Sequence, residues 1–66
     1  MNINLLKAKL VERSMNVEKL ATAISVDRSS LYRKFNNAEK ITIGEASKMK
    51  EVLNLTDAEA IQIFLP

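Results

Sequence analysis

A helix-start signal that occurs twice is the feature that most constrains the fold of this chain. Thr42 and Thr56 are each followed three residues later by a glutamate, Glu45 and Glu59. In such a capping box the threonine hydroxyl and the glutamate carboxylate each accept a backbone N–H group at the start of a helix. Each box stands directly before a stripe of apolar residues at helical spacing, so the sequence predicts a helix behind each one.

Single polar residues can cap three more helices in the first half of the chain. The candidate caps are Asn2 or Asn4, then Asn16, then Asp27. With the two capping-box helices, we expect five helices in all. The first ends at about residue 13, and the other four cover about residues 17–24, 28–35, 43–53 and 57–65. We expect the third helix to end at Asn36-Asn37, because asparagine accepts the left-handed conformation that ends many helices.

The composition agrees with an all-α fold that is held together by packing alone. The 66 residues include one glycine and one proline, which disfavours a turn-rich β fold, and they include no cysteine or histidine. A chain of this length makes one domain at most and has neither a disulfide nor a zinc site to stabilise it. We therefore expect a compact five-helix bundle that forms a single domain over residues 1–66.

The same composition disfavours several classes of function. Without histidine, cysteine or a glycine-rich phosphate loop, we expect no enzyme, no cofactor and no small-molecule substrate. No apolar run approaches the roughly 20 residues of a membrane span, so we expect no membrane contact. Residues 1–10 lack the apolar block of a secretory signal, which favours a cytoplasmic protein.

A helix-turn-helix pattern lies between residues 17 and 36. Two short helices are joined by a tight turn at Ser25-Val26, and the small Ala21 stands where the helices must cross closely. Leu31 and Phe35, four residues apart, form the inward face of the second helix. In this motif the second helix can lie in the major groove of DNA while the first crosses the backbone.

The segment from Val17 to Asn36, together with the helices around it, resembles the phage repressor and Cro family of DNA-binding proteins. The resemblance implies a bundle of four or five helices in which the third reads DNA. It also implies a cytoplasmic, nucleoid-associated homodimer that binds a palindromic operator and usually represses transcription. Ser25 replaces the family's usual turn glycine, and a left-handed conformation there costs roughly 1 kcal/mol. Val17 replaces a polar residue that often reaches a phosphate, so that contact does not carry over.

Four polar residues of the third helix point away from its apolar side and are the expected base-reading residues: Arg28, Ser29, Tyr32 and Arg33. Arginine can form paired hydrogen bonds with guanine, and tyrosine can contact a thymine methyl group. Basic residues are concentrated in the first two-thirds of the chain, which includes this helix: residues 1–40 hold eight of the ten lysines and arginines. A concentration of positive charge favours an anionic partner such as DNA.

A second set of residues is expected to contact phosphates, which positions a protein on DNA without specifying its sequence. This set is Asn16, Lys34, Asn36, Asn37, Lys40 and Thr42. Asn16 and Thr42 belong to it because the N-terminal amides of the helices that they cap can bind anions. Capping of the preceding helix is an equally good interpretation of Asn36 and Asn37, and both roles can hold at once.

The last helix carries more apolar residues than one stripe can bury, and Ile63, Phe64 and Leu65 are consecutive. Neighbouring residues on a helix point about 100° apart, so at least one of the three should be exposed. We expect Ile63 or Phe64 to lie in a homodimer interface, unless a longer native chain continues past Pro66 and covers them.

The alternative to DNA binding is a small protein-interaction module that regulates another DNA-binding protein.

Overall fold

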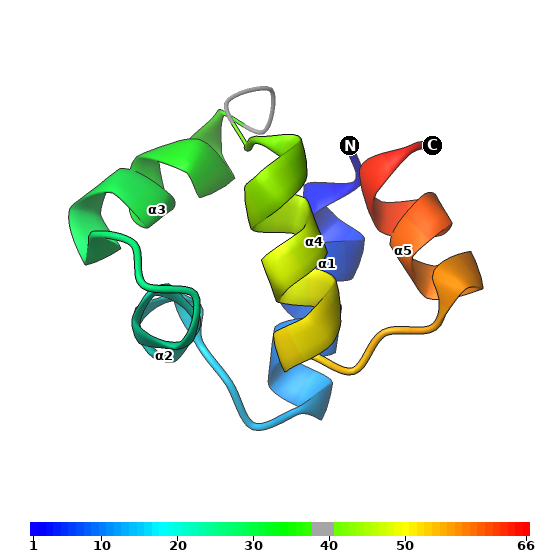
Figure 1. Ribbon diagram of the computed structural model, residues 1–66, viewed down its shortest axis with the longest axis horizontal. Coiled ribbons are helices and arrows are strands. Elements are labelled where there is room, and N and C mark those ends of the chain that lie inside the picture. Colours follow the sequence, from blue (N-terminus) through cyan, green and yellow to red (C-terminus); the bar gives the residue numbers. More distant parts are fainter. Residues whose placement is uncertain (38–40) are drawn as a thin grey trace.

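The computed structural model describes residues 1–37 and 41–66, and these residues form five α-helices and no strand. The helices are α1 (Ile3–Glu12), α2 (Val17–Ala23), α3 (Arg28–Asn36), α4 (Ile43–Val52) and α5 (Asp57–Phe64). They pack into a bundle with a radius of gyration of 10.5 Å (Figure 1). The expected all-α bundle is therefore confirmed, with helix ends within about two residues of the expected positions.

Each helix begins at a side chain that accepts a backbone N–H group from the residue three positions later. The N-caps are Asn2, Asn16, Asp27, Thr42 and Thr56. Both expected capping boxes are complete, because the Glu45 and Glu59 carboxylates accept the N–H groups of their cap residues at 2.9 Å. Local sequence therefore determines where every helix begins.

Three helices end with a residue in the left-handed conformation. Ser14, Ser25 and Asn54 have φ values of 56°, 60° and 51° and follow α1, α2 and α4. After Ser25 the chain returns at once, since the Val26 N–H group donates to the Ala21 carbonyl at 3.0 Å. This bond closes the turn between α2 and α3 and satisfies a carbonyl that the helix end leaves free. The expected role of Ser25 in the turn is confirmed.

The end of α3 differs from the expectation. Asn36 is the last residue of the helix, and Asn37 has φ −137° and ψ 80°, which is not a left-handed conformation. The Asn37 N–H group instead donates to the carbonyls of Arg33 and Lys34, within the geometry of the helix itself. Asparagine permits a left-handed end but does not require one.

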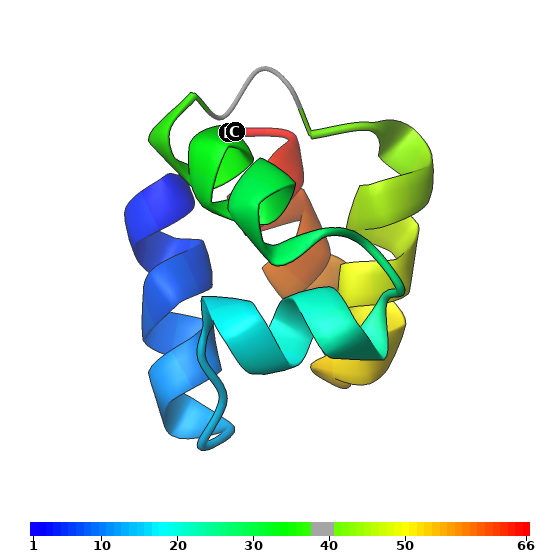
Figure 2. The same ribbon diagram turned by 90° about the vertical axis from the view of Figure 1, so that its left-hand side faces the viewer.

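The core lies where all five helices meet. Its fully buried side chains are Leu6, Leu20, Ile24, Leu31, Met49, Leu53 and Ile63. Ala21, on α2, is also buried, and α2 packs closely against α3. Figure 2 shows α2 and α3 together on one side of the molecule, with α5 behind them. Within residues 1–37 and 41–66, no helix is long and apolar enough to cross a membrane.

Candidate nucleic-acid interface

The outer face of α3 is polar and exposed. Leu31 and Phe35 bury the inner face of α3 in the core, at 0% and 4% exposure. The four expected base-reading residues, Arg28, Ser29, Tyr32 and Arg33, are all exposed, as their spacing requires. Within α3 there is no acidic residue, so the surface is polar and positively charged.

Arg28 begins α3 and is paired with an acidic residue of the preceding helix. Its Nη1 lies 3.1 Å from Oε1 of Glu18, which is in the first turn of α2. Both side chains are about 60% exposed, at 60% and 59%. Because the two residues lie on different helices, no spacing rule in the sequence reveals this pair.

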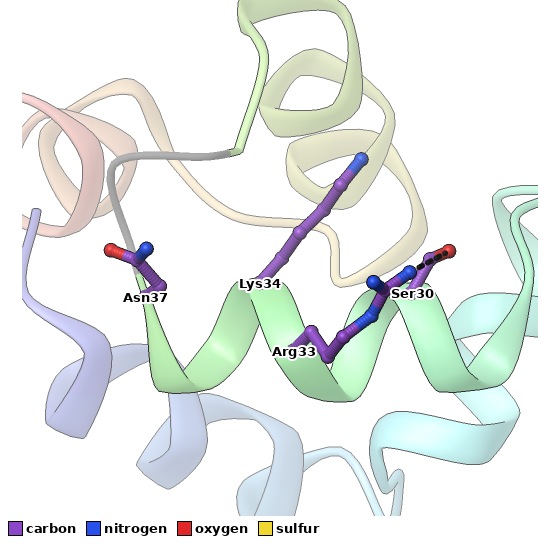
Figure 3. A pocket seen from close by; sticks show the side chains of 4 residues that line it. All are labelled: Ser30, Arg33, Lys34 and Asn37. Atoms are coloured by element: carbon purple, nitrogen blue, oxygen red, sulfur yellow. Dashed lines mark hydrogen bonds between the residues drawn. The ribbon is translucent and has the colours of Figure 1, made fainter.

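Arg33 lies on a second part of the outer face, where a hollow runs along α3 (Figure 3). The hollow has a volume of about 410 Å³ and is lined by Ser30, Arg33, Lys34 and Asn37. These residues recur at helical spacing and so share one side of the helix. The Arg33 guanidinium donates to the Ser30 hydroxyl at 3.2 Å, and Asn37 stands at the C-terminal end. Ser30 is a lining residue that the sequence interpretation omitted, although its spacing from Arg33 and Lys34 could have indicated it.

Lys34 extends from this hollow toward α4 and forms an ion pair with Glu45. The two side chains are only 27% and 13% exposed, which makes this pair better protected than the Arg28 pair. Burial acts to raise the pKa of the Glu45 carboxyl, but hydrogen bonds from Lys34 and the Thr42 N–H group outweigh it and lower the pKa. Glu45 therefore carries a negative charge that fixes the Lys34 ammonium group.

The structure brings together only part of the expected phosphate-binding set. Lys34 and Asn37 lie in the hollow, and Asn36 is exposed one residue earlier. The side-chain oxygens of Asn16 and Thr42 accept N–H groups of Lys19 and Glu45, so both act as helix caps. Lys40, the remaining member, lies outside the described residues.

The expected exposure of Ile63 is wrong, because its side chain is 0% exposed and part of the core. The Ile63 carbonyl also accepts the Asn2 N–H group at 2.7 Å, which holds this part of α5 against the start of α1. Phe64 is half-buried, while Leu65 is 74% exposed, so the expectation that at least one of the three would be exposed is confirmed. The packing of α5 against α1 therefore determines which of these three residues is buried and which reach the surface.

An apolar groove lies between α4 and α5. Its volume is about 260 Å³, and its apolar lining residues are Ile43, Ala46, Ala60, Ile61, Phe64 and Leu65. Three of these are large and strongly exposed, at 92% for Ile43, 54% for Ile61 and 74% for Leu65. Figures 1 and 2 both place α5 on the side of the bundle away from α3.

No protein-family model matches the chain, and neither does any of the curated proteins or solved structures with which it was compared. Function must therefore be inferred from the residues themselves. Among the described residues, no three or more acidic side chains gather in a way that could hold a metal ion. The chemistry that the outer face of α3 offers is hydrogen-bond donation from two guanidinium groups, hydroxyl groups and amides, which suits an anionic or base-bearing ligand.

Proposed function

We propose that this chain is a sequence-specific double-stranded DNA-binding domain that regulates transcription, with α3 as its reading helix in the major groove. The observation that carries the proposal is the division of α3 into two faces. Leu31 and Phe35 anchor the inner face in the core, while Arg28, Ser29, Tyr32 and Arg33 remain accessible on the outer face. A helix of this kind, held rigidly beside a second short helix, matches the geometry of major-groove recognition.

Charge supports DNA as the ligand. Arg33 donates to the Ser30 hydroxyl, and among residues 1–37 and 41–66 no carboxylate pairs with it, so none of those residues offsets its positive charge. Arginine donors are arranged for bidentate contacts with guanine, and Ser29 and Tyr32 add donors and acceptors beside it. Asn36 and Asn37 continue the polar surface toward the end of the helix and supply amides for phosphate or base contacts.

We also propose that the domain binds DNA as a homodimer through the groove between α4 and α5. One α3 helix contacts only a few base pairs, so a symmetric pair is needed to specify a longer site. The groove exposes Ile43, Ile61 and Leu65, and pairing with a second copy removes these apolar surfaces from water. Since α5 lies away from α3, pairing there leaves both reading helices free. Phe64 belongs to this interface, whereas Ile63 does not.

Selection from a pool of random duplexes tests the proposal directly. We expect the wild-type chain to enrich a motif with two-fold symmetry, whose halves are centred about 34 Å, or one turn of DNA, apart. A pool that stays random after repeated selection at low salt would contradict sequence-specific binding. Absence of any retained duplex would favour the protein-interaction module instead.

A further inference from the structure

The ion pair between Glu18 and Arg28 places a negative charge beside the proposed reading surface. Glu18 is held in the first turn of α2 behind the Asn16 cap, and Arg28 is the first residue of α3 behind the Asp27 cap. The caps fix where both helices begin, and the packing of α2 against α3 brings the two side chains within reach, with Nη1 and Oε1 3.1 Å apart. Any ligand that approaches Arg28 therefore also meets the Glu18 carboxylate.

Stability does not account for this pair. Both side chains are about 60% exposed, and exposed ion pairs contribute little to folding. The Lys34–Glu45 pair differs, because Glu45 is 13% exposed and also accepts the Thr42 N–H group that opens α4. Both pairs join two helices, but the exposed pair adds little to the stability of the fold, so its effect falls mainly on what Arg28 can bind.

We propose that Glu18 is a positioning residue that determines specificity by keeping Arg28 on a base and away from phosphates. This inference rests on the proposed DNA-binding function. The carboxylate engages the Nη1 end of the guanidinium and leaves the edge formed by Nε and Nη2 for a bidentate contact with guanine. A phosphate that approached Arg28 would instead face the like charge of Glu18, which disfavours contacts that do not depend on sequence.

The test compares Glu18→Gln with the wild type on two duplexes, the one that the wild type selects and a shuffled duplex of equal length and composition. We expect Glu18→Gln to tighten binding to the shuffled duplex about threefold to tenfold and to the selected duplex about twofold or less. Because Arg28 becomes free to contact a phosphate, the log–log salt dependence on the shuffled duplex should steepen by roughly 0.9. The melting temperature should fall only slightly, because the one stabilising role that Glu18 has is a negative charge in the first turn of α2.

Two further variants separate positioning from a general effect of charge. Glu51→Gln removes the same charge from an exposed residue in the last turn of α4 and should leave the preference between duplexes unchanged. In an Arg28→Ala background, Glu18→Gln should no longer alter that preference, because the group that it positions is gone.

Each result decides the matter. This inference is overturned, and DNA binding left intact, if Glu51→Gln lowers the preference for the selected over the shuffled duplex as much as Glu18→Gln does. The same holds if Glu18→Gln still changes that preference in the Arg28→Ala background. A wild-type chain that binds no duplex overturns the proposed function and this inference together.

Discussion

Lys34 on α3 and Glu45 on α4 form an ion pair that ties the reading helix to the helix that follows it. Lys34 is therefore committed to the fold, although its position in the sequence equally favours a phosphate contact. We expect Lys34→Ala to lower the free energy of unfolding by about 1 kcal/mol, since it leaves a largely buried carboxylate without its cation. Thermal unfolding measures this loss, and Lys48→Ala, at an exposed lysine of α4, is the control. Equal melting temperatures for both variants would show that the Lys34–Glu45 ion pair does not stabilise the fold.

The reading residues are tested by arginine substitutions. Arg33→Ala and Arg28→Ala should each weaken binding to the selected duplex by roughly 1–3 kcal/mol and relax the preference for one base pair. Both side chains are exposed, so neither substitution should change the melting temperature appreciably. Affinities for a set of singly mutated duplexes measure the effect. If the base preferences of Arg33→Ala equal those of the wild type, α3 does not read DNA through this residue.

Core packing of the helix-turn-helix is tested by two substitutions that touch no surface. Leu31→Ala removes a fully buried side chain and should cost about 2–5 kcal/mol of unfolding free energy. Ala21→Leu adds bulk where α2 and α3 meet, at a residue that is 1% exposed, and should cost about 1–3 kcal/mol. Denaturant unfolding measures both. A wild-type midpoint for either variant would show that α2 and α3 pack differently.

Acid should loosen the contact between α1 and α5 through Glu59. The Lys9 ammonium, 2.7 Å away, and the Thr56 N–H group lower the pKa of Glu59 from 4.5 to about 2. A lowered pKa means that Glu59 stabilises the fold above about pH 4.5 and that this contribution is lost as the pH falls toward 2. Glu59→Gln keeps a capping side chain but cannot ionise, so its stability should depend less on pH in that range. Glu51→Gln is the charge control, and if both variants follow the wild-type pH profile of stability, the Lys9 contact does not stabilise the fold.

The groove between α4 and α5 is tested by the oligomeric state. Ile61→Lys places a charge in the groove at a residue that is 54% exposed and should weaken self-association without unfolding the chain. Val11→Lys makes the same change at an exposed residue of α1 and should leave association unchanged. Sedimentation with and without a palindromic duplex measures both. If Ile61→Lys associates as strongly as the wild type, the dimer interface lies outside this groove.

Much of the fold could be predicted because helix starts are local. Asn16, Asp27 and the two capping boxes act within four residues, and the spacing of Leu31 and Phe35 fixes the inner face of α3. The exposure of Ile63 could not be predicted in this way. Three consecutive apolar residues compete for one core, and the packing of α5 against α1 selects among them.

The ion pairs around α3 were also beyond prediction from the sequence. Glu18 with Arg28 and Lys34 with Glu45 join different helices, so their distances depend on how the helices cross and not on residue spacing. Charge counts along the chain therefore overstate the positive charge available to a ligand. Of the three cations on α3, Arg33 is the one with no acidic partner among residues 1–37 and 41–66, which makes it the centre of the proposed surface.

The salt dependence of duplex binding tests the central claim most directly. If the domain binds DNA, cationic groups of the complex neutralise about four or more phosphates and release counterions, so the plot of log affinity against log salt should have a slope of roughly −4 or steeper. The measurement uses the wild-type chain and its selected duplex over a range of monovalent salt. A slope near zero, or no binding to any duplex at low salt, would contradict the assignment of this domain as a DNA-binding protein.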